Sequence, residues 1–282
     1  MNQAAAFAWG SRTAVMAVLN LTPDSFSDGG RHNDPQRALT AALRLSRQGA
    51  DIIDLGPQSS RPGAIEVGVA TELQRLMPVL QQLALARAEA RLPAELVLSV
   101  DTFHAAVAAA ALAAGANWIN DISAGTADPA MLPLVAKAGC PYVLMHRRGN
   151  SLNMDKLANY QDVVAEVEAE LLERSAAALE AGVHRRQLIW DPGLGFAKTT
   201  AHNIKLLQQL PRLASHGFPL LVGPSRKRFI GEVLNEPRPR ARLWGTAASI
   251  CRAVAGGAAV VRVHDVAPAV QLCRMADALW AD

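Results

Sequence analysis

The 282-residue sequence is poor in cysteine and in long apolar runs, and each scarcity argues against a class of protein. Its three cysteines, Cys140, Cys251 and Cys273, have no paired spacing, which indicates buried thiols in a reducing compartment rather than a disulfide framework. No apolar run approaches the roughly 20 residues of a membrane span. The N-terminus carries no basic segment before its short apolar patch, so a secretory signal is not expected.

The charges also lack a strong excess of either sign. The formal net charge is +3, and the arginines and lysines are scattered along the chain, so a nucleic-acid-binding surface is not indicated. Hydrophobic residues make up 50 % of the chain and charged residues 19 %, a composition that supports a large core. We therefore expect a globular, cytoplasmic protein that binds neither nucleic acid nor membrane.

Short apolar runs alternate with longer segments of helical periodicity from one end of the chain to the other. The predicted strands are 14–19, 51–55, 96–100, 117–120, 142–145, 188–190, 219–222 and 260–263. The predicted helices are 35–48, 71–87, 105–114, 129–137, 161–181, 201–214, 241–255 and 267–279. Eight such units without a Pro-, Gly- or Ser-rich linker match a (β/α)8 TIM barrel better than an open doubly wound sheet. We predict one α/β domain over residues 1–282, with its core at about 13–280.

Each predicted strand leads into polar residues, and in such a barrel the carboxyl ends of the strands form the functional face. These residues are Asn20, Asp54, Asp101, Asn120, His146, Asp191, the pair Ser225 and Lys227, and the pair Arg262 and His264. A single aspartate after a strand, such as Asp101, is also a common helix N-cap. Eight caps of such mixed chemistry are less plausible than one shared site.

The acids and amides of this set predict a ligand rich in hydrogen-bond donors. Asp101, Asn120 and Asp191 together would accept hydrogen bonds from a flat heterocycle with amino and ring N–H groups. The alternative is a structural network in which Lys227 and Arg262 neutralise the buried acids.

A second group of residues suits anions. Arg262, His264 and Asn20 would hold an anion of the size of a diphosphate, and Mg²⁺ fits there because it binds oxygen ligands and substrate phosphates. No H-x-H, H-E-x-x-H or C-x-x-C spacing indicates a fixed transition metal. The basic run 226–228 and the loop 59–63 suggest a second, acidic substrate, although three consecutive basic residues are also typical of a solvated face.

Seven motifs, in this order along the chain, resemble those of the dihydropteroate synthases, the folate-pathway enzymes of bacteria, lower eukaryotes and plants. They are the segments 20–30, 59–63, 99–102, 120–122, 191–193, 225–227 and 262–264. The first (Asn-Leu-Thr-Pro-Asp-Ser-Phe-Ser-Asp-Gly-Gly) and the last two (Ser-Arg-Lys and Arg-Val-His) are the most specific. The resemblance implies a transferase that condenses 6-hydroxymethyl-7,8-dihydropterin diphosphate with 4-aminobenzoate, giving 7,8-dihydropteroate and diphosphate.

The resemblance also implies roles for individual residues. The pterin would be bound by Asp101, Asn120, Met145, Asp191, Phe196, Gly223 and Lys227. The diphosphate would be held by Asn20, Arg61, Arg262 and His264, with Mg²⁺ between it and Asn20. The 4-aminobenzoate would enter beside Ser60, Arg61, Pro62, Ser225 and Arg226. The residues expected to act in catalysis are Asp101, Asp191, Lys227, Arg262 and His264.

The expected mechanism is an ionisation-first substitution at the pterin methylene. Asp101 and Asp191 would stabilise the pterin-methyl cation, and no Ser-His or Cys-His pairing in the motifs indicates a covalent intermediate. The resemblance further implies loops that close over the site, with Phe26 as a lid contact, inhibition by sulfonamides, and a homodimer formed through helices away from the barrel mouth. Two alternatives stay open: a pterin-dependent methyltransferase and a catalytically silent pterin-binding homologue.

The chain departs from the common family pattern around the predicted site. Residues 57–60, Pro-Gln-Ser-Ser, stand where Gly-Glu-Ser-Thr is common, Arg147 replaces an apolar residue, and Ala197 replaces a glycine. Pro57 is expected to stiffen the root of its loop, and together with Ser60 to shift sulfonamide sensitivity.

Overall fold

The computed structural model describes residues 9–22, 35–61 and 63–280. Within them, parallel strands pair in sequence order and close into a barrel, with β1 paired to both β2 and β8. The strands are β1 (Ala14–Asn20), β2 (Ile52–Gly56), β3 (Val97–Asp101), β4 (Trp118–Asp121), β5 (Tyr142–Met145), β6 (Leu188–Asp191), β7 (Leu220–Val222) and β8 (Ala258–Val263). The predicted TIM barrel is confirmed.

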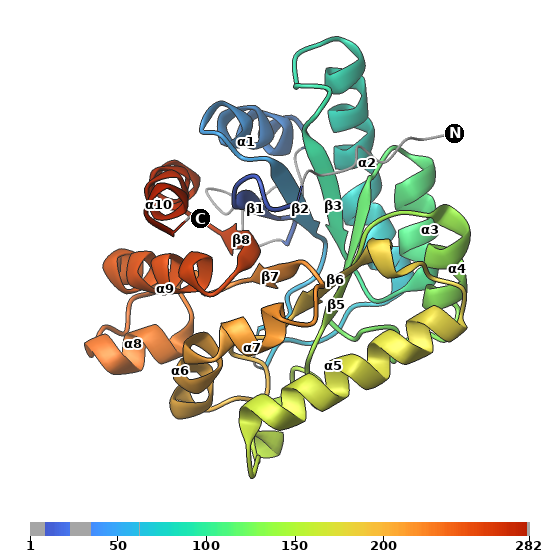
Figure 1. Ribbon diagram of the computed structural model, residues 1–282. Helices are drawn as coiled ribbons and strands as arrows, with labels where there is room; N and C mark the ends of the chain where they lie inside the picture. The colour runs from blue at the N-terminus through green and yellow to red at the C-terminus, as the bar shows by residue number, and fades with distance from the viewer. Residues whose placement is uncertain (1–8, 23–34, 62, 281–282) are drawn as a thin grey trace.

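Helices surround the barrel (Figure 1). They are α1 (Pro35–Arg47), α2 (Val69–Ala88), α3 (Ala105–Ala113), α4 (Met131–Ala138), α5 (Val163–Glu180), α6 (Thr200–Gln208), α7 (Leu210–Ala214), α8 (Arg228–Leu234), α9 (Leu243–Ala255) and α10 (Val266–Trp280). Short 3₁₀ turns lie at Met154–Leu157, Arg185–Gln187 and Pro239–Arg242. No helix in this part of the chain is both long and apolar enough to cross a membrane.

Apart from small shifts at the helix ends, the structure differs from the predicted helices in two places. The predicted helix 201–214 is divided into α6 and α7, and Pro211 stands in the first turn of α7, where a missing N–H costs nothing. The short helix α8 was not predicted. It begins directly after Lys227, inside the basic run that the sequence presented as a loop.

One layer of side chains, which we call the interior layer, fills the inside of the barrel. Its buried members are Ala14, Met16, Ile52, Val97, Trp118, Val143, Ile189, Leu221 and Val260. Since successive strand residues point to opposite faces, their neighbours, such as Ile53 and Leu98, pack outwards in the larger core shared with the helices.

The same period of two places the polar residues of the barrel mouth. The inward positions that follow the interior layer are Asp54, Asn120, Met145, Asp191 and Arg262, two residues after Ile52, Trp118, Val143, Ile189 and Val260, respectively. The interior layer is therefore the floor of a polar chamber at the carboxyl ends of the strands.

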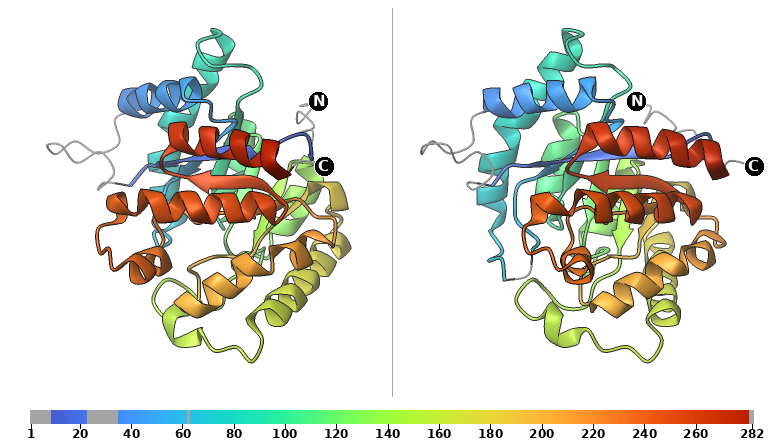
Figure 2. Two further views of the ribbon diagram at one scale, coloured as in Figure 1. Left: turned by 60° about the vertical axis from the view of Figure 1, so that its left-hand side comes forward. Right: turned by 90° about the vertical axis from the view of Figure 1, so that its left-hand side faces the viewer.

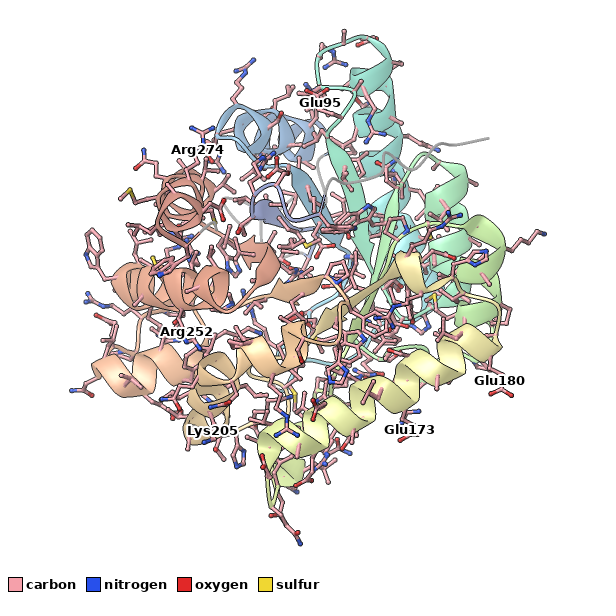
Figure 3. All side chains as sticks on the ribbon, viewed as in Figure 1. Glu95, Glu173, Glu180, Lys205, Arg252 and Arg274 are labelled. Carbon is pink, nitrogen blue, oxygen red and sulfur yellow. The ribbon has the colours of Figure 1, made fainter. Side chains whose placement is uncertain are left out.

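The outer ring carries the solvent-facing charges. Figure 3 labels several charged side chains at the periphery of the ring of helices. The exposed ones are Glu95, Glu173, Glu180, Lys205 and Arg274. The helices α9 and α10 lie side by side, against β8 and β1, respectively (Figure 2).

Truncation of the interior layer is expected to destabilise the barrel. Ile52 is fully buried, so Ile52→Ala should lower the free energy of unfolding by about 2–5 kcal/mol. Ile65 is 81 % exposed and Ile65→Ala, as the matched control, should change it by less than about 0.5 kcal/mol. Urea unfolding followed by circular dichroism measures both variants, and equal losses would contradict the packing described for the barrel interior.

Candidate active site

Arg262 reaches into the barrel mouth and binds two carboxylates. Its Nε donates to Oδ2 of Asp54 at 2.7 Å, and its Nη2 donates to Oδ2 of Asp101 at 2.9 Å. Burial, opposed by Arg262 and reinforced by Asp54, raises the pKa of Asp101 to about 7. The residue that caps α3 is His104, so the alternative of Asp101 as a helix cap is wrong.

Asp54 is fully buried and holds other site residues in place. Besides Arg262, its carboxylate accepts from Ser99 Oγ at 2.7 Å and from Asn120 Nδ2 at 3.0 Å. Its hydrogen bonds thus orient a guanidinium and an amide that face the chamber. The sequence placed Asp54 at a strand end but assigned it no role. The signal was its inward position two residues after Ile52.

Asp191 and Lys227 belong to one electrostatic cluster beside Phe196. Oδ1 of Asp191 accepts from the Gly193 N–H at 2.7 Å. Burial raises the pKa of Asp191, against this hydrogen bond and the positive charges of Lys227 and Arg262. Burial lowers the pKa of Lys227 to about 8, and its Nζ lies 4.5 Å from the centroid of the Phe196 ring. The ring packs on a small apolar cluster of Phe103, Ile122 and Met145.

His264 and Ser225 hydrogen-bond to each other. Ser225 Oγ accepts from the His264 backbone N–H at 3.1 Å and lies 3.0 Å from Nδ1 of the ring. We assign the hydroxyl proton to the bond with Nδ1, which places the ring proton on Nε2. Burial, followed by the charges of Arg226 and Arg262, lowers the pKa of His264 to about 3. His264 is therefore a neutral N–H donor and too weak a base to activate Ser225.

The three basic residues 226–228 point in different directions. Arg226 donates to both carboxylate oxygens of Asp265, at 3.0 and 2.6 Å, and Lys227 lies in the barrel mouth. Arg228 pairs with the exposed carboxylate of Asp155. The solvated-face interpretation therefore holds for Arg228 alone.

Two non-glycine residues near the site have left-handed backbones. Arg226 has φ +60° and Ala197 has φ +49°, conformations that cost about 1–2 kcal/mol in a residue with a β-carbon. The Arg226 N–H donates to Thr246 Oγ1 at 3.1 Å, which helps hold the strained turn. Ala197 stands where the related motif commonly has glycine, and its φ explains that preference.

The loop after β2 is tied internally and to the loop after β5. Gln58 Oε1 accepts from the Val67 N–H at 3.0 Å, and Ser151 Oγ donates to the Ala64 carbonyl at 2.6 Å. Pro57 contributes its carbonyl, which accepts from Arg75 Nη1 at 2.9 Å. Gln58, whose neutral amide stands where a charged residue is common, thus ties one end of the loop to the other.

The remaining predicted contacts lie around the rim of the chamber or outside the described residues. Asn20 ends β1, and a β-carbon added to Gly56 would lie 3.3 Å from its Oδ1. Ser60 lines a small pocket with Phe196 and Arg147, and Arg61 is exposed. Gly223 follows β7 next to Arg262. Pro62 and Phe26 lie outside the described residues.

The described residues contain no group of three or more His, Cys, Asp or Glu side chains arranged to hold a metal ion. Asp54 and Asp101 are paired with Arg262, which leaves the amide oxygen of Asn20 as the predicted metal contact. A Mg²⁺ ion fits such a sparse set only when a bound ligand supplies most of its oxygens.

A second buried lysine was not predicted. Lys198 is 2 % exposed, and its Nζ lies 2.8 Å from His146 Nδ1 and donates to the Phe196 carbonyl at 3.0 Å. Burial lowers its pKa to about 7. Nothing in the sequence around Lys198 distinguishes it from a surface lysine, since its burial depends on the path of the loop after β6.

A side chain at Gly193 is expected to be incompatible with this loop. Gly193 has φ +66°, and a β-carbon there would lie 1.9 Å from the His146 carbonyl oxygen. Gly139 has the same φ with nothing within 4 Å of a β-carbon, so Gly139→Ala should cost only the conformational strain, about 1–2 kcal/mol. Gly193→Ala should cost a further 1–3 kcal/mol or so. Urea unfolding tests this, and similar losses in both variants would refute the close approach.

The chain is similar to known pterin enzymes over nearly its whole length. A family profile described as "Pterin binding enzyme" matches residues 16–264. The dihydropteroate synthase of Synechocystis sp. is 50 % identical over 274 residues, which are 97 % of this chain and 92 % of that protein.

Solved structures of dihydropteroate synthases show the same similarity in sequence and in fold. The dihydropteroate synthase of Xanthomonas albilineans with 4-aminobenzoic acid is 45 % identical, with a TM-score of 0.87 over 96 % of this chain and 94 % of that chain. The structure of the Xanthomonas albilineans enzyme with 7,8-dihydropteroate is 43 % identical, with a TM-score of 0.84 over 96 % of this chain and 95 % of that chain. The Yersinia pestis enzyme with a sulfonamide drug is 41 % identical, with a TM-score of 0.87 over 95 % of this chain and 94 % of that chain. A barrel with an acidic mouth, matched in sequence and in shape from end to end, places this chain in the dihydropteroate synthase family of pterin-binding enzymes.

Proposed function

We propose that the chain condenses 6-hydroxymethyl-7,8-dihydropterin diphosphate with 4-aminobenzoate, releasing 7,8-dihydropteroate and diphosphate in folate synthesis (EC 2.5.1.15). The observation that carries this proposal is the grouping of buried acids with Arg262 and Lys227 at the barrel mouth of a dihydropteroate synthase family member. The relatives whose structures contain 4-aminobenzoic acid and 7,8-dihydropteroate support both ends of the reaction.

The pterin is proposed to bind between the acids and the apolar cluster. Asp101 and Asp191 each hold one carboxylate oxygen in a hydrogen bond to the protein, so the second oxygen of each is the proposed acceptor for amino and ring N–H groups. Asn120 and Lys227 would complete the polar edge. Phe196 and Met145 would cover the ring, and Gly223 would leave room beside Arg262.

The diphosphate is proposed to bind Asn20, Arg61, Arg262 and His264. Because His264 is neutral, it would stabilise the leaving anion through its Nε2–H, while the arginines supply the positive charge. Asp101 and Asp191 would then stabilise the pterin-methyl cation electrostatically, so that ionisation precedes attack by the weakly nucleophilic arylamine. The Ser225–His264 pair orients the imidazole in this scheme, and no covalent intermediate is needed.

Mg²⁺ is proposed to bind between the diphosphate and the Asn20 side chain. When bound, it would neutralise charge that develops on the leaving diphosphate. The sparse set of protein ligands fits this arrangement, since Mg²⁺ usually keeps several waters and binds substrate phosphates together with few protein groups. Arg262 and His264 hold and orient the same anion from the end of β8.

The 4-aminobenzoate is proposed to enter beside Ser60, Arg61, Pro62, Ser225 and Arg226, with sulfonamides competing for this position. The pocket that Ser60 shares with Phe196 supports entry next to the pterin. The side chains of Ser225 and Arg226 already bind His264 and Asp265, so they would chiefly shape this subsite, and Arg61 would attract the carboxylate.

Three broader properties are also proposals. Exposed apolar side chains on the neighbouring helices α9 and α10, Trp244, Met275 and Leu279, support a homodimer formed through this face. The three free cysteines support a cytoplasmic location. The barrel supports a single domain over residues 1–282, with its core at about 13–280.

An assay of the purified protein tests the reaction. With both substrates and Mg²⁺, diphosphate release that depends on 4-aminobenzoate is expected. Chelation of Mg²⁺ should lower the rate at least about 10-fold and leave the binding of a pterin without diphosphate unchanged. Absence of aminobenzoate-dependent release would refute the synthase function and favour the methyltransferase or the silent homologue, whereas full activity after chelation would refute only the metal.

Asp191→Asn tests the position of the pterin. It removes a charged partner worth about 1.5–3 kcal/mol, so pterin affinity should fall roughly 10- to 150-fold. Glu173→Gln removes an exposed charge on α5 and should leave the affinity unchanged. Titration calorimetry measures both variants, and near-normal pterin binding by Asp191→Asn would place the ring elsewhere.

A further inference from the structure

Glu170, His146 and Lys198, which the proposed reaction does not use, form a line behind Phe196, whose ring is proposed to cover the pterin. Glu170 Oε2 lies 3.0 Å from His146 Nε2, and Lys198 Nζ lies 2.8 Å from His146 Nδ1. The same Nζ donates to the carbonyl of Phe196, whose ring lies in the apolar cluster at the barrel mouth. The line thus runs from α5 to the proposed pterin site.

The proton positions in this line follow from its partners. Because the Lys198 ammonium is a donor, Nδ1 of His146 is an acceptor and the ring proton lies on Nε2, facing Glu170. Burial, and then the charge of Lys198, lowers the pKa of His146 to about 4. Burial alone would raise the pKa of Glu170, but the nearby His146 ring and hydrogen bonds from Arg148 lower it to about 2. Between the pKa of His146 and that of Lys198, at about 7, the line therefore holds a carboxylate, a neutral imidazole and an ammonium.

Lys198 is an unusual buried cation. No carboxylate of the described residues forms an ion pair with its Nζ, and the negative charges of Asp191 and Glu170 act on it from a longer distance. A lysine that only filled this volume would be replaceable by an apolar side chain at little cost. Lys198 instead forms hydrogen bonds with His146, which orients the loop after β6, and with the Phe196 carbonyl in that loop.

The loop after β6 connects Lys198 to both sides of the proposed pterin position. The His146 N–H donates to the Asp191 carbonyl at 2.9 Å, and Gly193 packs its α-carbon against the His146 carbonyl. Lys198 then fixes the other end of the loop through Phe196. Its charge also opposes the rise that burial causes in the pKa of Asp191.

We propose that Lys198 is a positioning residue for the pterin, which fixes the Phe196 wall through the carbonyl and, together with Lys227 and Arg262, helps keep Asp191 charged through its ammonium. This inference rests on the proposed function, since it requires the pterin to lie between Asp191 and Phe196. His146 and Glu170 act through Lys198 by holding its hydrogen-bond acceptor in place.

Lys198→Met removes the ammonium and keeps most of the side-chain volume. Pterin affinity should fall about 10- to 100-fold, and KM for the dihydropterin diphosphate should rise in parallel. KM for 4-aminobenzoate and the melting temperature should change little. Lys205→Met, on the exposed side of α6, is the matched control and should change none of these quantities. Unchanged pterin affinity in folded Lys198→Met would overturn the proposal.

The pH dependence of pterin affinity separates the electrostatic role from a merely structural one. The titratable and charged groups around the ammonium are His146, Glu170, Arg148, Asp191, Lys227 and His202. Of the cations among them, Lys198 loses its proton first, at a pKa of about 7, so its contribution to wild-type affinity should be lost as the pH rises through this value. Asp101, whose pKa is also about 7, titrates in both proteins, so the step of Lys198 is the difference between the wild-type and Lys198→Met profiles near pH 7, and the later step at about 8 from Lys227 stays in both. Identical profiles would refute the proposal.

A double-mutant cycle tests the route of the effect. In the Asp191→Asn background the loss caused by Lys198→Met should shrink, because its electrostatic part acts on a charge that is no longer there. If Lys198→Met does not fold, Glu170→Gln, at a partly exposed position, should still weaken pterin binding about 3-fold or more. Failure of the wild-type protein to bind pterin would refute the proposed function, whereas normal wild-type binding with unaffected variants would refute only the role of Lys198.

Discussion

The pairing of Arg262 with Asp54 and Asp101 is the interaction on which the rest of the site depends. Two carboxylates inside a protein barrel are costly unless a cation and further donors satisfy them. Arg262 supplies the cation, and Ser99 and Asn120 supply the donors to Asp54. Because β2, β3, β4 and β8 each contribute a member, the network forms only when the barrel is closed. Closure of the fold and assembly of the site are therefore one event.

A second electrostatic cluster lies around Asp191. Here the compensation is distributed, with a backbone N–H, Lys227 nearby and Lys198 farther away. In the proposed site, arginines near the barrel mouth would attract the anion, and the neutral His264 would give it a directed hydrogen bond. The chamber can thus hold a donor-rich ring against its acids and an anion against its arginines at the same time.

Most of the fold and the membership of the chamber were predictable from the sequence. Eight apolar runs with polar ends predict the barrel, and the period of two explains why Asp54, Asp191 and Arg262 point inwards. Asp54 and Asp101 lie 208 and 161 positions before Arg262 in the sequence. The sequence offers their pairing with Arg262 only as an alternative, because strand order does not determine which side chains meet. Lys198 was missed since its burial depends on a loop path that periodicity does not encode. The short α8 was missed because its seven residues are too few to show a helical period.

The interior layer has an evolutionary consequence. Trp118, Ile189 and Val260 form the floor of the chamber and also part of the barrel core, so a change that deepens the chamber removes packing on which folding depends. Escape from an inhibitor is therefore confined to the rim, where loops carry less of the stability. The departures of this chain at Pro57, Gln58 and Ser60 lie in that rim. These three departures leave the interior layer unchanged.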